Sequence, residues 1–339
     1  MKESKEQKEL KELKDVMKYL IAASNNSPYP LYAQYLHSED GFVYTCSGTA
    51  FSKAKVNLPF KGDVNIFVLD EILKNVNYDC DIKVENNNLI ISKNNYVSKL
   101  IIDQIEFPSI KDKDVHTVEI TEDLLKTLKR AGKFTSSGIA QYVYMCNNFV
   151  CSYSRDYAFF KKMSLDVKEP IGIAKNIIPM LNVGDRIGTY ESNVLVYFKN
   201  GYIMFTSSMI EEYPSDWIEE EFTKKTNVDL QYLISMETFN KISTALKPIF
   251  FGEKKAFIEL HNKNKELVGT AESHVNGRST FTVKTELEEE FTFFVNLHYM
   301  SLIPIAYNIQ IEIGKEKLDD IILSDDKSYV LMKGGHDES

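Results

Sequence analysis

The sequence predicts an α+β protein built from three similar domains in series. One pattern of strands and helices occurs three times along the 339 residues, with a period of roughly 110 residues. Within each unit, apolar residues mostly alternate with polar ones at a period of two, which is typical of half-buried strands. Only two segments per unit show the 3.6-residue period of a helix. Each domain is therefore expected to be a mostly antiparallel sheet with two helices on one side.

The front half of each unit begins with an amphipathic helix, predicted over residues 10–23, 122–132 and 236–246. Extended segments punctuated by turns follow each helix. In the first two units these segments resemble each other in letters, V-Y-T-C-S-G-T-A-F-S-K-A-K-V-N-L against V-C-S-Y-S-R-D-Y-A-F-F-K-K-M-S-L.

The back half of each unit is a strand, a second helix and more strands. These blocks read N-I-F-V-L-D-E-I-L-K-N-V, I-G-I-A-K-N-I-I-P-M-L and F-T-F-F-V-N-L-H-Y-M-S-L-I, and the first two close on Phe107-Pro108 and Tyr213-Pro214. Charged runs at residues 111–114 and 219–221 are the expected linkers. The predicted domains are residues 1–114, 115–221 and 222–339.

Composition is that of a globular protein and sets limits on its location. About 43% of the residues are hydrophobic, and no run of about 18 apolar residues predicts a membrane span. The N-terminal stretch is rich in Lys and Glu and does not resemble a secretory signal. The four cysteines lack a C-x-x-C pair or a histidine at zinc spacing, so we expect reduced thiols in a cytoplasmic protein.

Lysines follow the buried edge of the first helix in two of the three units. In the first unit Lys11, Lys14 and Lys18 stand directly after the apolar positions Leu10, Leu13 and Met17. In the second unit Leu125 and Leu128 are followed in the same way by Lys126 and Lys129, and in the third unit the matching places are Asn240, Ser243 and Lys247. Such a surface would contact phosphates without reading bases. The expected positions are Lys11, Lys14, Lys18, Lys126, Lys129, Arg130, Lys133, Lys175, Lys241 and Lys247.

A simpler interpretation of these lysines stays open. A lysine stripe on an amphipathic helix is often only a solvated face, and acidic neighbours such as Glu9, Glu12 and Asp15 favour ordinary pairs within the helix. The net charge of −9 also argues against nucleic acid unless the basic residues gather on one face. The distribution of the lysines is therefore more informative than their number.

With these blocks in order, the chain resembles the bacterial β sliding clamp, the ring subunit of DNA polymerase III. The resemblance covers nearly the whole chain and depends most on the Phe107-Pro108 and Tyr213-Pro214 blocks, on residues 294–299 and on the terminal strand 329–332. It implies a DNA clamp fold and a head-to-tail homodimer that encircles duplex DNA. It also implies a processivity factor that tethers a polymerase and is loaded by a clamp loader.

The resemblance further implies a hydrophobic cleft that binds short linear peptides of polymerase, loader and other partners. Carried over by position, the cleft residues are Arg155, Tyr157, Ala158, Phe160, Asn296, Tyr299, Leu318, Asp320, Val330, Leu331 and Met332. The chain has Y-S-R-D-Y-A where the family commonly has Thr-Asp-x-His-Arg-Leu, and it ends in a polar tail. This divergence suggests a phage or mobile-element form with an altered cleft floor.

No motif for catalysis is present. The sequence lacks phosphate-binding glycine loops, H-E-x-x-H and G-x-S-x-G, and its six histidines are scattered. We therefore expect a non-catalytic accessory subunit without cofactor, metal or membrane partner. The alternative is a clamp-fold structural or interaction protein that no longer slides on DNA. The weaker third helix keeps that alternative open.

Overall fold

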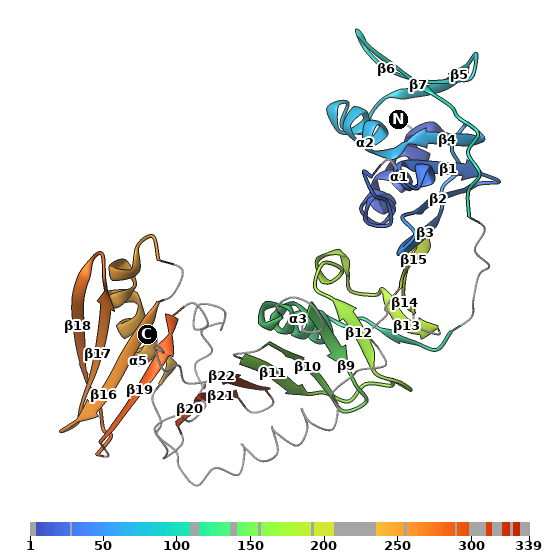
Figure 1. Ribbon diagram of the computed structural model, residues 1–339. Helices are drawn as coiled ribbons and strands as arrows, with labels where there is room; N and C mark the ends of the chain where they lie inside the picture. The colour runs from blue at the N-terminus through green and yellow to red at the C-terminus, as the bar shows by residue number, and fades with distance from the viewer. Residues whose placement is uncertain are drawn as a thin grey trace. The chain divides into compact units, whose positions relative to one another are not determined.

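The computed structural model describes most of the chain, which divides into two compact units (Figure 1). The first unit comprises residues 1–125 and 166–212, and the second comprises residues 126–165 and 213–339. None of the described helices is long and apolar enough to cross a membrane. The described residues are 5–27, 29–108, 115–135, 141–154, 157–190, 193–206, 235–253, 256–288, 290–297, 310–313, 321–325 and 328–332.

The first repeat contains two helices, as expected from the sequence. The Asn65 side chain caps the second helix by accepting hydrogen bonds from the backbone N–H groups of Phe67 and Val68. Its elements are α1 (Lys5–Ala22), η1 (Leu31–Gln34), β1 (Tyr35–Glu39), β2 (Phe42–Cys46), β3 (Ala50–Lys55), β4 (Gly62–Asn65), α2 (Ile66–Asn75), β5 (Asp81–Glu85), β6 (Asn88–Lys93) and β7 (Tyr96–Ile101).

The second repeat follows the same order, but its second helix is reduced to a short 3-10 turn. Pro179 lies in this turn, and proline both lacks an N–H donor and obstructs the preceding helical turn. The elements are β8 (Thr117–Glu119), α3 (Glu122–Ala131), η2 (Gly132–Phe134), β9 (Tyr142–Met145), β10 (Phe149–Tyr153), β11 (Tyr157–Lys162), β12 (Ile171–Ala174), η4 (Ile178–Met180), β13 (Arg186–Tyr190), β14 (Asn193–Phe198) and β15 (Gly201–Thr206).

The third repeat begins with a helix at the position that its period predicts. The helix expected after residue 297 lies outside the described residues. The elements are α5 (Met236–Leu246), η6 (Lys247–Phe250), β16 (Phe257–Lys263), β17 (Glu266–Ser273), β18 (Gly277–Lys284), β19 (Phe291–Asn296), β20 (Gln310–Ile313), β21 (Ile321–Asp325) and β22 (Ser328–Met332).

Antiparallel sheets run from one repeat into the next. In the first unit the order β4-β1-β2-β3-β15-β14-β13-β8 joins strands of the first and second repeats, and β5-β6-β7 forms a separate sheet. In the second unit β9, β10, β11, β22, β21 and β20 are successive neighbours, which joins the second and third repeats, and β18-β17-β16-β19 forms another sheet. The α+β class with antiparallel sheets is thus confirmed, while the predicted boundaries at residues 114 and 221 stay a prediction.

The same contact ties the first helix of a repeat to its sheet. At the fourth residue of β2, Thr45 Oγ1 donates to Leu20 O at 2.8 Å. At the fourth residue of β10, Ser152 Oγ donates to Ala131 O at 2.7 Å. The fourth residue of β17 is Gly269, where an added Cβ would lie 2.3 Å from the side chain of Ile242 on α5. The third helix therefore packs against its sheet without the hydroxyl.

We predict that Ser152→Ala lowers the free energy of unfolding by about 1–3 kcal/mol, because the Ala131 carbonyl loses its hydroxyl donor. Thr45→Val is expected to lower it by about 1 kcal/mol, since Leu20 O keeps the hydrogen bond from Ser24 Oγ at 2.8 Å. Unfolding in urea measures the change. The control is Thr49→Val at an exposed turn, where a change within about 0.5 kcal/mol is expected. An equal loss in all three variants would contradict the assignment.

Candidate DNA-contacting helices and partner-peptide strands

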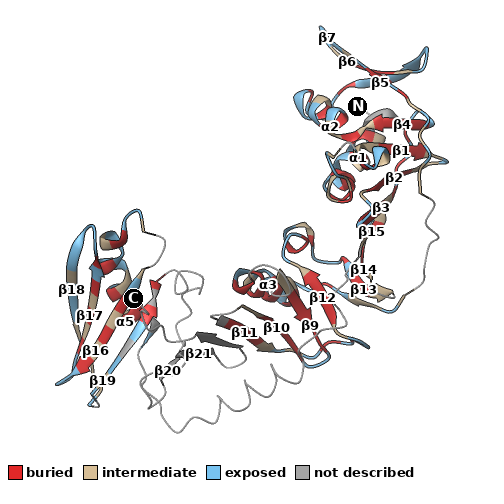
Figure 2. Cartoon of the chain, in the orientation of Figure 1, coloured by how far each residue is buried: buried red, intermediate tan, exposed pale blue. Residues whose placement is uncertain are grey.

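Helix α1 buries one face and exposes the lysines beside it. Leu10, Leu13 and Leu20 are buried, and α1 packs against β2, β3 and α2. Figure 2 shows buried residues gathered along the sheets and the helix faces turned toward them. The neighbouring side chains of the predicted basic row, Lys11, Lys14 and Lys18, are exposed.

Lys18 has a structural contact that the sequence did not suggest. Its Nζ donates to Met180 O at 2.8 Å and to Asn182 Oδ1 at 3.3 Å, so it connects α1 to the loop before β13. Lys14 Nζ, by comparison, lies 5.5 Å from the centre of the Tyr78 ring. The predicted lysine row thus has members with different local environments.

Tyr19 completes this junction between the first two repeats. Its hydroxyl lies 3.2 Å from Asp185 Oδ2 and accepts a 2.7 Å hydrogen bond from Asn182 Nδ2. Its ring stacks on Phe198 with centroids 4.0 Å apart. Burial, followed by the charge of Asp185, raises the pKa of the Tyr19 hydroxyl far above its usual value. The hydroxyl therefore stays protonated and serves as a fixed part of the junction.

We predict that Lys18→Met lowers the free energy of unfolding by about 1 kcal/mol, because the bonds to the Met180 carbonyl and Asn182 are lost. Urea unfolding provides the measurement. Lys129→Met is the matched control, since Lys129 is exposed at the corresponding place on α3, and its effect is expected within about 0.5 kcal/mol. A Lys18 variant as stable as the control would show that the junction does not depend on this lysine.

Helix α3 repeats the arrangement with one difference at Arg130. Leu124 and Leu128 are buried, and Lys126, Lys129 and Lys133 are exposed. Arg130 is half-buried and its guanidinium lies 5.5 Å from the centre of the Phe159 ring. A guanidinium over an aromatic ring contributes to packing, so Arg130 supports the helix as well as adding charge.

Helix α5 carries the weakest basic surface, as expected. Phe239, Ile242 and Leu246 form its buried face. The exposed Lys241 pairs with Glu237 at 2.8 Å, an ordinary i,i+4 contact that fits the simpler interpretation of a solvated face. The two remaining predicted lysines are exposed as well, Lys247 at the start of η6 and Lys175 between β12 and η4.

Strands β11 and β22 bring distant members of the predicted peptide cleft together. Their register places Tyr157 opposite Met332 and Ala158 opposite Leu331. Val330 is opposite Phe159, the residue before Phe160. Asn296 is the last residue of a different strand, β19, and lies opposite Phe257 of β16. The other predicted cleft residues, Arg155, Tyr299, Leu318 and Asp320, lie outside the described residues.

One face of the β9-β10-β11 sheet is a buried aromatic cluster. Ala158 and Phe160 are buried in it with Tyr144 and Phe149, and the rings of Phe149 and Phe160 are 4.9 Å apart. The sequence suggested Ala158 and Phe160 as cleft residues but missed this cluster. The continuous apolar runs at residues 142–146 and 149–151 are the signal that could have revealed it, because strands buried on both faces read as unbroken apolar runs.

Comparison with solved structures identifies the architecture. The β subunit of DNA polymerase III from Thermotoga maritima matches with a TM-score of 0.77, 12% identity, and 96% of this chain and 98% of that chain covered. The Bacillus subtilis sliding clamp matches with a TM-score of 0.76, 15% identity, and 98% and 97% covered. The chain has the fold of the bacterial β sliding clamps. No protein-family model and no curated protein sequence matches the chain.

The predicted clamp fold is therefore confirmed, although almost no sequence identity remains. A third similar structure is the Helicobacter pylori β clamp bound to a DNA ligase peptide, with a TM-score of 0.76, 12% identity, and 96% and 98% covered. Within this clamp fold, α1, α3 and α5 hold equivalent places in the three repeats. The Thr45 and Ser152 contacts align Leu20 with Ala131, so Lys18 and Lys129 occupy matching positions, and each helix carries exposed lysines beside its buried face.

Proposed function

We propose that the protein is a DNA sliding clamp, a non-catalytic processivity factor that encircles duplex DNA and tethers a polymerase to it. The observation that carries this proposal is the clamp fold over nearly the full length, combined with exposed lysines beside the buried faces of α1 and α3. Contacts from lysine to phosphate do not depend on base sequence. A ring with such contacts can stay on DNA and still move along it.

Net charge is compatible with this proposal. The chain carries 49 acidic and 40 basic residues, so its surface as a whole repels DNA. Rows of exposed lysines on α1 and α3 would make these helices the favoured DNA-facing surface. The acidic remainder would discourage binding elsewhere.

The repeats themselves suggest how a ring closes. The third strand of the first repeat, β3, pairs with β15, the last strand of the second repeat, and β11 pairs in the same way with β22. Two strands of the same kind remain, β18, the third strand of the third repeat, and β7, the last strand of the first repeat. Each stands at the end of its sheet among the described strands. Pairing β18 of one subunit with β7 of another would continue the pattern and give a head-to-tail homodimer.

The two observed pairings also fix an expected register for the third. The penultimate residues of β3 and β11, Ala54 and Lys161, are opposite the first residues of β15 and β22, Gly201 and Ser328. By the same rule, Val283 of β18 is expected opposite Tyr96 of β7 in the partner subunit. Each further pair moves one residue along both strands, which brings Thr282 opposite Val97.

Exposed apolar side chains support this contact. Val97 is 59% and Ile101 67% exposed on β7, and Phe281 is exposed on β18. Phe251 and Val275 are also exposed, and Asn276 Nδ2 bonds to Phe251 O at 3.2 Å, which holds their loops together beside the start of β18. Apolar groups exposed along open strand edges are typical of surfaces that become covered on association.

We predict that Val97→Cys combined with Thr282→Cys forms a disulfide between subunits under mild oxidation, because directly opposite residues lie within disulfide reach. Non-reducing electrophoresis detects the covalent dimer. The control is Val97→Cys with Thr280→Cys, a diagonal pair on the same face that is too far apart. The native cysteines are buried and free and do not interfere. Equal linkage in both pairs, or none in either, would contradict the register.

Partner peptides are proposed to bind beside β11 and β22. The Helicobacter pylori β clamp binds a DNA ligase peptide, and the β11–β22 register gathers six predicted cleft residues of this chain on neighbouring strands. Polymerase and clamp loader would attach here through short linear peptides. We also propose a cytoplasmic location, where DNA replication takes place, and the phage or mobile-element origin stays a prediction.

We predict that Lys126→Ala combined with Lys129→Ala weakens binding to duplex DNA equally for unrelated sequences. Removing two phosphate contacts should reduce the slope of log affinity against log salt by about 2. Fluorescence anisotropy over a salt series measures both effects. The control replaces Lys55 and Lys162, exposed lysines that end β3 and β11, and should keep the wild-type slope.

The same experiment separates the clamp from the alternative function. A clamp-fold interaction protein that does not work on DNA would lose nothing when Lys126 and Lys129 are replaced. The pairing of Lys241 with Glu237 is the observation that favours this alternative. An unchanged salt slope in the α3 variant would therefore favour the interaction protein over the sliding clamp.

A further inference from the structure

A short segment after β7 closes the open edge of the first sheet. Residues 102–107, here termed the strap, run beside β4, where Asp63 N donates to Asp103 O at 3.0 Å and Asp103 N donates to Asp63 O at 2.8 Å. Ile105 N then donates to the Asp63 side chain at 2.8 Å. The strap therefore depends on Asp63 through both its backbone and its carboxylate.

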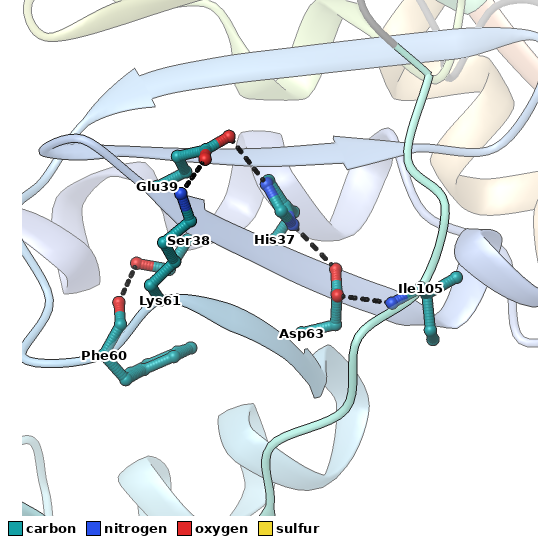
Figure 3. A network of polar contacts seen from close by, with 7 residues as sticks. All are labelled: His37, Ser38, Glu39, Phe60, Lys61, Asp63 and Ile105. Carbon is teal, nitrogen blue, oxygen red and sulfur yellow. Dashed lines mark hydrogen bonds and ion pairs between the residues drawn. The ribbon is translucent and has the colours of Figure 1, made fainter.

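His37 on β1 contacts both ends of this attachment. Its Nδ1 lies 2.8 Å from Asp63 Oδ1, and its ring stacks on the strap residue Phe107 with centroids 5.3 Å apart and planes inclined by 16°. Phe107 also meets the Tyr32 ring edge-on at 6.1 Å. Figure 3 shows His37 directed toward Asp63, which in turn receives the Ile105 amide.

The charges around His37 favour its protonated form. Asp63 is only 1% exposed, and a buried carboxylate needs a cation or several donors. On the other side of the ring, Nε2 lies 3.4 Å from Glu39 Oε2, and Glu39 forms an ion pair with Lys61. With the imidazole protonated, Lys61, Glu39, His37 and Asp63 form an alternating row whose charges cancel.

Two further groups complete the surroundings of this row. The Tyr44 ring of β2 lies 5.9 Å from the His37 ring. Asp103 on the strap and Asp63 both raise the pKa of the nearby Tyr35 hydroxyl, after the larger effect of burial. Neither tyrosine adds charge at neutral pH, so the carboxylates determine the electrostatic environment of His37.

We propose that His37 is a protonation-controlled latch for the strap. The imidazolium holds Asp63 in position to accept the Ile105 amide and supports the Phe107 ring. Loss of the proton leaves the buried carboxylate with less compensation and loosens the strap from β4. This proposal concerns the first repeat alone and does not depend on the proposed function in DNA replication.

The direction of the pH dependence follows from linkage. The hydrogen bond to Asp63 raises the pKa of His37 above its usual value, against the smaller effect of burial. A raised folded-state pKa means that the stabilisation is fully present below the unfolded value of about 6.5 and is lost as the pH rises through the folded-state pKa. The Lys61 contact lowers the pKa of Glu39, so this carboxylate changes its protonation only in the acid range.

The third repeat supplies a matched control. His261 occupies the place on β16 that His37 occupies on β1, two residues before the end of the strand. It also bonds to the neighbouring strand, but its Nδ1 partner is Thr292 Oγ1 at 2.7 Å, which carries no charge. His261→Gln therefore removes an imidazole from the same strand position without removing a charged latch.

Hydrogen exchange of the intact protein, followed by mass spectrometry between about pH 6 and pH 9 and corrected for intrinsic rates, tests the latch. In wild type and His261→Gln, strap protection at low pH should exceed that at high pH. In His37→Gln and Asp63→Asn, the ratio of strap protection at low pH to strap protection at high pH should be close to one. Strands β2 and β3 serve as the internal reference for folding.

Several outcomes would overturn the latch. One is a wild-type strap whose corrected protection does not change with pH. Another is a His37→Gln protein that keeps the wild-type profile. Loss of protection in β2 and β3 in parallel with the strap would also reject the proposal, because it would mean that pH acts on the whole sheet.

Discussion

Strand pairing between successive repeats is the constraint on which the rest of the structure depends. A repeat buries its own helices against its own strands, yet its third strand has a complete set of backbone partners only when the last strand of the next repeat pairs with it. The β3–β15 and β11–β22 pairings satisfy this need within the chain. A chain of three repeats therefore leaves one such strand at each end, β18 and β7, and an open edge of this kind either needs protection or joins another chain.

The placement of each first helix follows from that pairing. A hydroxyl on the second strand of the first two repeats donates to a carbonyl near the end of the helix, and close packing at Gly269 replaces it in the third. The apolar stripe must face the sheet, so the residues directly after it must lie on an exposed side. Lysines at those places thus become available to an outside partner without a special loop. The charges of these lysines add little to the free energy of folding, since exposed ion pairs contribute little to stability.

Some polar residues serve the framework instead of a partner. Lys18 lies in the predicted basic row, yet its ammonium bonds to the Met180 carbonyl and sits beside the Tyr19–Asp185 contact. Arg130 similarly packs over Phe159. A helical period identifies which side of the helix a residue occupies, but two residues on the same side can meet different surroundings. The His37–Asp63 contact is of the same kind, because it unites β1, β4 and the strap from positions 26 and more residues apart.

The repeat, the alternation of apolar residues and the helix periods by themselves determined the α+β class, the element order and the exposed rows on α1 and α3. These features depend on local spacing, which is written directly in the sequence. Prediction of the helix at 236–246 agreed with α5, whereas Pro179 reduced the second helix of the middle repeat to a 3-10 turn. Only the tertiary structure decided which strands of different repeats pair, which lysine is tied to a carbonyl and how His37 meets a buried carboxylate. Those contacts join residues far apart in sequence, and their energies depend on burial and distance, which no local pattern encodes.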